Sequence, residues 1–225
     1  MIVILLCCSL LAFPVRGVQQ TQFVALTFDD GPSGRFTRRL LEGLEHRDAK
    51  ATFFLCGYRI EQYPELTRRI TAEGHEIGLH GYSHKAMETM DRKEVTREIQ
   101  RIFSQLQDIS PITFLRTPGG RISKCVQSAA GEFGLSILHW SVDPQDWATH
   151  DVKKVVDHVT SRVRDGDVIL MHDMSDSSVD AALAIIDRLH KLGFQFVTVS
   201  ELAEKQGITP EPGKRYTRFP KEFAK

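Results

Sequence analysis

Seven short apolar segments, each followed by a segment with helical spacing, recur along the chain from residue 23 onward. The predicted strands are residues 23–28, 51–56, 75–79, 112–115, 136–142, 168–171 and 194–199. Strands this apolar are typical of parallel sheets that are covered on both faces. A repeated strand–helix unit predicts an α/β protein, built either as a (β/α) barrel or as an open doubly wound sheet. The first strand is not followed by G-x-G-x-x-G, which counts against a dinucleotide-binding fold.

The two ends of the chain differ from this repeat. Residues 2–13 are an unbroken apolar run, too short for the ~20 residues of a membrane helix, and Pro14, Arg16 and Gly17 end it. We therefore expect residues 1–17 to be a secretory signal peptide, with a retained membrane anchor as the alternative. One domain is expected over residues 18–207. Residues 208–225 are rich in Pro, Lys and Arg and are expected to form a basic, extended surface tail.

Composition narrows the choice of partner and compartment. The 29 Lys+Arg residues balance the 29 Asp+Glu residues, which argues against a nucleic-acid-binding protein. The signal peptide predicts a protein that is secreted, at the cell wall or cell surface, with no stable membrane insertion after cleavage. The 4 Cys residues are too few for a disulfide scaffold. Cys56 and Cys125 either pair in an oxidising compartment or remain thiols. Nothing in the sequence predicts an oligomeric state.

Polar residues with chemical potential follow five of the predicted strands. They are Asp29 and Asp30 after the first strand, His80 and His84 after the third, Arg116 after the fourth, Asp143, Asp146 and Trp147 after the fifth, and His172 and Asp173 after the sixth. The carboxyl ends of barrel strands form one mouth, where catalytic groups collect. We therefore expect these side chains to meet in space.

Each of these groups also has an ordinary structural interpretation when it is taken alone. The Asp29–Asp30 pair is typical of a turn or a helix cap. His80 and His84 are spaced one helical turn apart, which suits either a metal ion or a solvated helix face. Position 81 is not Glu, which excludes the H-E-x-x-H metalloprotease motif. Arg116 alone indicates a surface ion pair, and His172 alone fits a core histidine as well as a functional one.

Taken together, the segments resemble a known family. TFDDGP at 27–32, HGYSH at 80–84, RTPGG at 116–120, DPQDW at 143–147 and LMH at 170–172 are similar, in this order, to the five motifs of the polysaccharide deacetylases. This is the NodB-homology domain of carbohydrate esterase family 4, which includes chitin and peptidoglycan deacetylases. The resemblance runs from Phe23 to Leu202. It implies a distorted, incomplete (β/α) barrel with about seven parallel strands.

The resemblance also implies a role for each motif residue. Asp30, His80 and His84 match a triad that holds one divalent metal ion, Zn²⁺ in the first place and Co²⁺ as the alternative. Four residues match the catalytic groups: Asp29 the general base, Arg116 the residue that positions it, His172 the general acid and Asp146 the carboxylate that orients this histidine. Three residues match the substrate-binding pocket: Trp147 and Leu170 as apolar walls, and Gly119 as an oxyanion donor through its N–H.

The implied activity is metal-dependent N-deacetylation of N-acetylglucosamine polymers, chitin-like, with release of acetate. Two positions depart from the family pattern. Gly81 replaces the usual Ser or Thr of the second motif, and Gly119 replaces the usual aromatic residue of the third. These departures keep two alternatives open. One is a weak or inactive deacetylase-fold protein with a glycan-associated role, and the other is an esterase that acts on O-acetylated polysaccharides.

Overall fold

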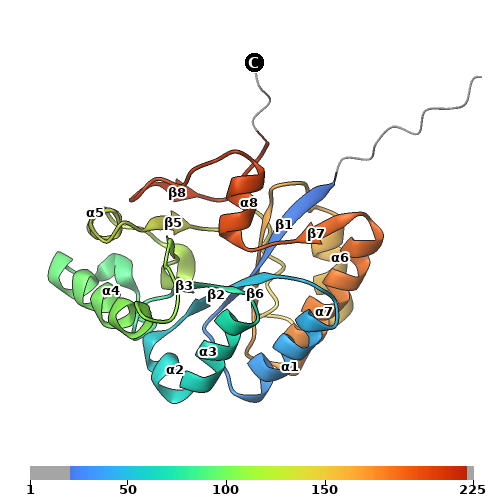
Figure 1. The fold of residues 1–225 in the computed structure, drawn as a ribbon, viewed down its shortest axis with the longest axis horizontal. Coiled ribbons are helices and arrows are strands. Elements are labelled where there is room, and N and C mark those ends of the chain that lie inside the picture. Colours follow the sequence, from blue (N-terminus) through green and yellow to red (C-terminus); the bar gives the residue numbers. More distant parts are fainter. Residues whose placement is uncertain (1–20, 222–225) are drawn as a thin grey trace, which may run out of the picture.

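The computed structural model describes residues 21–221, so the predicted signal peptide lies outside the described residues (Figure 1). The sheet is built from strands β1 to β8, whose bounds are Gln22–Asp29, Ala51–Leu55, Glu76–Leu79, Phe114–Leu115, Ser136–Leu138, Val168–His172, Phe194–Phe196 and Arg215–Tyr216. The strand order is β6-β1-β2-β3-β4-β5-β8, and β7 also pairs with β1. Every named pair is parallel. The predicted distorted, incomplete barrel is confirmed.

Helices cover the outside of this curled sheet. Their bounds are α1 Arg35–Glu45, α2 Gly57–Gln62, α3 Pro64–Ala72, α4 Arg92–Leu106, α5 Lys124–Glu132, α6 Val152–Thr160, α7 Asp176–Lys191 and α8 Val199–Lys205, with short 3₁₀ turns at Met87–Thr89 and Pro118–Gly120. Asp91 and Glu94 form a capping box at the start of α4. Among the described residues, no helix has both the length and the apolar character to cross a membrane.

The alternation of side chains along β1 explains how the barrel is filled. Val24, Leu26 and Phe28 belong to the large apolar cluster beneath the helices, whereas Ala25 belongs to a second cluster that includes Phe54 and Phe114. Successive side chains of a strand point to opposite faces. Thr27 and Asp29 therefore share the inner face with Ala25, and Asp29 ends the strand on the inside of the barrel.

The fifth predicted strand, residues 136–142, is shorter than expected. β5 ends at Leu138, and the chain rejoins the sheet only at Val142, which makes a single parallel bridge to Ile169 of β6. Between these points His139 and Trp140 leave the ladder, and Trp140 takes part in the cavity described below. Through the bridge from Val142 to Ile169, the chain that follows β5 contacts β6 and so narrows the opening in the wall of the incomplete barrel.

The expectation of an extended surface tail is wrong for residues 215–219. Arg215 and Tyr216 form β8 alongside β5, and Phe219 is fully buried. The Phe219 ring contacts Phe114 at 6.3 Å between centroids, and its N–H donates to the carbonyl of Gly166 at 2.8 Å. This segment therefore belongs to the domain.

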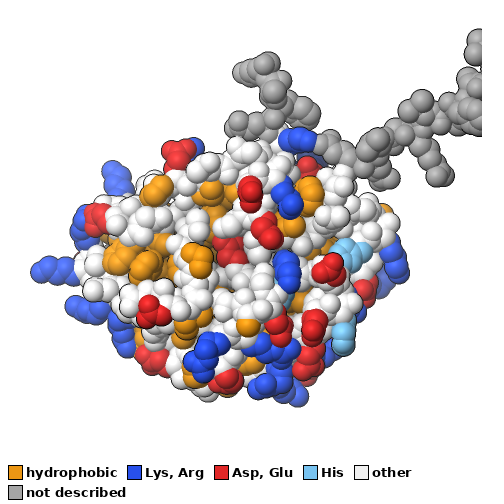
Figure 2. Space-filling model, in the orientation of Figure 1, with side chains coloured by type: hydrophobic (Ala, Val, Ile, Leu, Met, Phe, Trp, Pro, Cys, Tyr) orange, Lys and Arg blue, Asp and Glu red, His pale blue; other side chains and the backbone are white. Residues whose placement is uncertain are grey.

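Cys56 and Cys125 are both free thiols. Burial raises the pKa of the Cys56 thiol, which makes it a poor nucleophile. On the face shown in Figure 2, Lys and Arg side chains are interspersed with Asp and Glu side chains rather than gathered in one field, consistent with the balanced charge of the sequence.

Candidate active site

The first two motif carboxylates lie at the end of β1 and have different surroundings. Asp29 is buried, and its Oδ1 accepts a hydrogen bond from Arg116 Nη1 at 2.7 Å. Asp30 has φ 74, a backbone conformation that few non-glycine residues adopt. This turn directs the Asp30 carboxylate to the imidazoles of His80 and His84, which lie 3.3 and 2.8 Å from its Oδ1.

Arg116 is fully buried inside the barrel, so it is not the surface ion pair that the residue alone suggested. Its guanidinium donates to Thr27 Oγ1, to Asp29 and to the carbonyls of Leu138 and His139. It also lies 4.0 Å from the centroid of the Phe54 ring. Burial lowers the pKa of Arg116, and the Asp29 carboxylate opposes that change. Arg116 thus fixes the orientation of Asp29.

Asp30, His80 and His84 form a cluster suited to a metal ion. One ligand atom from each residue lies within 4.8 Å of the others. His80 Nδ1 is 2.9 Å from the carbonyl of Arg116, so Nδ1 carries the proton and the Nε2 lone pair faces Asp30. Oδ1 of Asp30 is buried, and its near polar neighbours are the Nε2 atoms of His80 and His84. Two imidazole nitrogens and one carboxylate oxygen, held this close together, are a ligand set that suits a divalent cation and leaves one coordination position open.

His80 and His84 are not on a helix, and the expected helical turn between them is wrong. Residues 80–84 form a loop in which Gly81 has φ 74 and His84 has φ 57. This backbone reversal, rather than the i, i+4 geometry of a helix, brings the two rings to 5.3 Å between centroids. Gly81 suits this loop because positive φ is accessible to glycine at little cost.

His172 ends β6 and is paired with Asp146. His172 Nδ1 lies 2.9 Å from one carboxylate oxygen of Asp146, and the His172 N–H donates to the other at 2.9 Å. Burial alone lowers the pKa of His172. The hydrogen bond and charge of Asp146, with the charges of Asp29 and Asp30, outweigh burial and raise the pKa to about 9. The imidazole is therefore held protonated at neutral pH in the metal-free protein.

The motif residues converge on one cavity of about 380 Å³ at the carboxyl ends of the strands. Its lining consists of Asp29, Asp30, His80, His84, Gly119, Trp140, Asp143, Trp147, Leu170 and His172. The structure thus brings together nine residues of the predicted motifs, and Arg116 and Asp146 support the site from behind through hydrogen bonds. Trp147 is 64% exposed, so only part of its ring faces the cavity.

Trp140 lines this cavity and was not predicted from the sequence. A Cβ atom on Gly120 would lie 2.7 Å from Cη2 of Trp140, whereas a Cβ on Gly119 would meet no atom within 4 Å. The indole therefore packs against Gly120, next to Gly119, the position at which this chain lacks the aromatic residue of the family pattern. Within the strand predicted at 136–142, Trp140 could not be told from an ordinary core residue.

Asp173 follows His172 and holds the first motif from below. Its carboxylate accepts a hydrogen bond from the Thr37 hydroxyl, and its carbonyl accepts one from the Ser33 hydroxyl. Burial raises the pKa of Asp173 to about 6. A Cβ atom on Gly31 would lie 2.8 Å from Asp173 Oδ1, so this close approach requires glycine. Asp173 is therefore a support for the Asp29–Asp30 turn and does not line the cavity.

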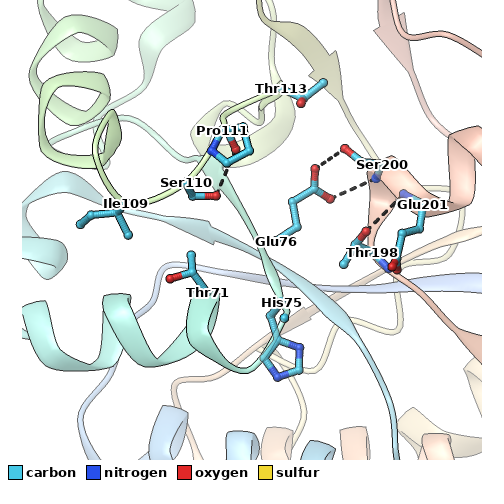
Figure 3. Close-up of a pocket in the computed structure, with 11 residues that line it drawn as sticks. Thr71, His75, Glu76, Ile109, Ser110, Pro111, Thr113, Thr198, Ser200 and Glu201 are labelled. Carbon is cyan, nitrogen blue, oxygen red and sulfur yellow. Dashed lines mark hydrogen bonds between the residues drawn. The ribbon is translucent and has the colours of Figure 1, made fainter.

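A second cavity, of about 390 Å³, lies among the start of β3, the segment before β4 and the start of α8 (Figure 3). Glu76 points into it, and its carboxylate accepts hydrogen bonds from the hydroxyl and N–H of Ser200 and from the Thr52 hydroxyl. Burial raises the pKa of Glu76, an effect that these donors oppose. The Glu76 carboxylate is thus occupied by hydrogen bonds that join β3 to α8. We therefore do not regard this cavity as a competing active site.

Comparison with known proteins agrees with this geometry. The family model described as polysaccharide deacetylase matches residues 16–138. The chain belongs to the polysaccharide deacetylase family. A peptidoglycan-N-acetylglucosamine deacetylase of Bacillus cereus is 38% identical over 188 residues, covering 80% of this chain and 88% of the relative. A chitooligosaccharide deacetylase of Sinorhizobium fredii is 34% identical over 187 residues, covering 76% of this chain and 87% of the relative.

Some relatives of this chain are much longer. The peptidoglycan-N-acetylmuramic acid deacetylase PdaC of Bacillus subtilis is 39% identical over 184 residues, which are 80% of this chain but only 38% of that protein. Among solved structures, a family 4 acetyl xylan esterase from Clostridium thermocellum in complex with a cobalt ion has a TM-score of 0.82 at 30% identity, covering 88% of this chain and 100% of the other.

Proposed function

We propose that this member of the polysaccharide deacetylase family is a divalent-metal-dependent hydrolase that removes acetyl groups from N-acetylglucosamine residues in a glycan polymer. The observation that carries the proposal is that an Arg-held carboxylate, an Asp-held imidazole and an Asp-His-His cluster line one cavity. Amide hydrolysis needs a base, an acid and charge stabilisation at the carbonyl oxygen. This cavity offers groups suited to each task.

The ion would be held by Asp30, His80 and His84. When bound there, a divalent cation supplies Lewis-acid polarisation of the acetyl carbonyl. Zn²⁺ suits the His-His-Asp donor set, and the cobalt ion named in the related esterase structure makes Co²⁺ the alternative.

The protein's own residues divide the proton transfers. Asp29, fixed by Arg116, is placed to accept a proton from the attacking water. His172, held protonated by Asp146, is placed to donate a proton to the departing amine. Leu170, Trp140 and Trp147 form apolar parts of the wall around the acetyl group, and the N–H of Gly119 is available to the oxyanion. The products are acetate and a glucosamine unit.

The polymer is proposed from relatives, two of which are named for peptidoglycan and one for chitooligosaccharide. A chitin-like or peptidoglycan-like N-acetylglucosamine chain is therefore the proposed substrate. O-acetyl ester hydrolysis is the second candidate, supported by the similarity to an acetyl xylan esterase. Gly81 and Gly119 leave the metal cluster and the proton-transfer groups in place, which favours an active enzyme over an inactive glycan-associated protein.

The test is acetate release by the purified protein, loaded with Zn²⁺ or Co²⁺, from chitooligosaccharides, peptidoglycan and acetylated xylan. Asp29→Asn and His172→Ala should each abolish release, whereas Glu45→Ala, an exposed acid on α1, should leave it unchanged. Release only from acetylated xylan would establish the esterase instead. Bound metal without release from any of the three polymers would contradict the proposed enzyme.

We further propose that residues 1–17 are removed as a signal peptide and that the mature protein acts outside the cell, at the wall or surface. Such polymers are extracellular, and the apolar run at residues 2–13 supports export. Mass spectrometry of the protein from the culture medium should show a new amino terminus near residue 18. Recovery only of the uncleaved chain in membranes would support a retained anchor.

A further inference from the structure

The loop between His80 and His84, two of the three proposed metal ligands, is held in place by a residue outside every family motif discussed above. His80 ends the strand region, His84 lies four residues later, and the three residues between them have no helical or strand conformation. A ligand on such a loop binds a cation tightly only if the loop is kept in place before the ion arrives. The contacts of residues 81–83 show what does this.

Glu98 of α4 accepts three hydrogen bonds from this loop. Its Oε2 accepts the backbone N–H groups of Tyr82 and Ser83, both at 2.8 Å. Its Oε1 accepts the hydroxyl of Ser83 at 2.9 Å. Hydrogen bonds to an ionised acceptor are about twice as strong as those between neutral groups, and Glu98 is partly shielded from solvent. The carboxylate thus holds both loop amides that immediately precede His84.

Gly81 lies beside this contact. Its φ of 74 suits glycine, and a Cβ atom there would lie 3.5 Å from Glu98 Oε2 and 3.3 Å from Met87 Sδ. On its other side the loop is tied to the start of α2, because the N–H groups of Gly57 and Tyr58 donate to the carbonyls of Gly81 and Tyr82, both at 3.1 Å. The loop is therefore clamped between α2 and α4. On the α2 side the Tyr82 hydroxyl also donates to the Glu61 carboxylate at 2.8 Å, whereas on the α4 side Glu98 binds the loop's backbone N–H groups.

We propose that Glu98 is a positioning residue for the metal site, which fixes the 81–83 loop so that His84 meets Asp30 and His80. The inference rests on the proposed metal-dependent function, but it concerns metal affinity and can be measured without any substrate.

The experiment is calorimetric titration of the metal-free protein with Zn²⁺, and absorption spectroscopy with Co²⁺ as a second probe. Glu98→Ala should weaken Zn²⁺ binding by about 10–100-fold, the usual range for residues that orient metal ligands. Glu98→Gln should stay within about threefold of wild type, because the carboxamide oxygen still accepts the two N–H groups and its NH₂ donates to the Ser83 hydroxyl. Ser83→Ala, which removes one contact of three, should fall between them.

Glu45→Ala is the control for removing an exposed acid. The melting temperature of each metal-free variant separates general destabilisation from a specific effect, since a merely structural residue would lower the melting temperature without changing Zn²⁺ affinity in the folded protein. Amide exchange in the metal-free wild type provides a test without mutation: the N–H groups of Tyr82 and Ser83 should be protected.

Three results would overturn the inference. They are Zn²⁺ affinity of Glu98→Ala within twofold of wild type, Glu98→Gln as weak as Glu98→Ala, or rapid exchange of both loop amides. If Glu98→Ala does not fold, the Glu98→Gln and Ser83→Ala titrations and the exchange measurement decide. A wild-type protein that binds neither Zn²⁺ nor Co²⁺ would instead contradict the proposed function, whatever the variants do.

Discussion

Arg116 lies directly behind Asp29 in the barrel interior, with its Nη1 2.7 Å from the Asp29 Oδ1. Both residues are buried. Asp29 ends β1 and Arg116 directly follows β4, and these two strands are not neighbours in the sheet. Three further donors of Arg116 bind the Thr27 hydroxyl and the carbonyls of Leu138 and His139. The guanidinium therefore links Asp29, the proposed base at the end of β1, to the backbone at the end of β5.

Replacing Arg116 should damage both folding and catalysis. Removing one partner of a buried ion pair costs roughly 3–5 kcal/mol, because the other charge is left uncompensated. Arg116→Ala should lower the free energy of unfolding by about this amount. Arg116→Lys cannot form the same fork of hydrogen bonds and should fold better but lose most acetate release. Denaturant unfolding and initial rates check both expectations. An Arg116→Lys enzyme with wild-type rates would contradict a positioning role for the guanidinium.

The His172–Asp146 pair predicts the alkaline limit of activity. A general acid must be protonated, so the rate should fall as pH rises through the pKa of His172, which Asp146 raises to about 9 against the effect of burial in the metal-free protein. Asp146→Asn removes the negative charge, and loss of a close opposite charge lowers such a pKa by roughly 1–3 units. The alkaline limb of kcat/KM should therefore move to lower pH.

The same shift should be visible without catalysis. In an NMR titration of the metal-free protein, the His172 ring should titrate at lower pH in Asp146→Asn than in wild type. His158 of α6, whose pKa burial lowers and which lies outside the cavity, serves as the internal control. An unchanged alkaline limb together with an unchanged His172 titration would show that Asp146 does not tune the acid.

Trp140 should contribute to substrate binding through its place in the cavity wall. Trp140→Ala removes this apolar surface and should raise KM roughly tenfold, equivalent to about 1.4 kcal/mol of binding. The comparison is Trp147→Ala, whose ring is 64% exposed and should have the smaller effect on a short oligosaccharide. Steady-state kinetics on chitotetraose would measure both. An unchanged KM in Trp140→Ala would mean that the indole only fills space between β5 and the third motif.

Phe219 should stabilise the domain from the carboxyl-terminal segment. Replacing a fully buried Phe by Ala typically costs 3–5 kcal/mol, and the Phe219 ring is fully buried against Phe114 and Tyr216. Phe219→Ala should therefore lower the free energy of unfolding by about that amount, whereas Thr217→Ala on the exposed side should have little effect. If the two variants had the same free energy of unfolding, the segment would be a surface tail that does not stabilise the domain.

The parts of the molecule that follow from local pattern were predictable from the sequence. The apolar strands identified the barrel, and the convergence of parallel strand ends placed Asp29, His80 and His172 at one mouth. Loop conformation was not predictable in this way: the His80–His84 spacing suggested a helix, but positive φ at Gly81 and His84 forms a loop instead. Such a reversal depends on tertiary anchors, of which Glu98 is one.

Three other features were missed for related reasons. Trp140 lies in an apolar run, where core and cavity residues have the same pattern. Glu98 is a charged residue on an amphipathic helix, and its partners are distant backbone amides that no periodicity reveals. The β8 strand is two residues long and polar, so it lacks the apolar signal by which the other strands were recognised, and only its pairing with β5 defines it.

Asp29 and His172 are partners in the parallel register of β1 and β6, although most of the chain's residues lie between them in the sequence. Closing so long a loop costs chain entropy before any contact repays it, so pairings of this kind tend to form late. A nascent chain in which β6 has not yet been synthesised holds Asp29, one member of the proposed proton-transfer pair, without His172. The ability to catalyse the proposed reaction should therefore appear in a single step near the end of folding, when β6 pairs with β1, rather than increase as each strand forms.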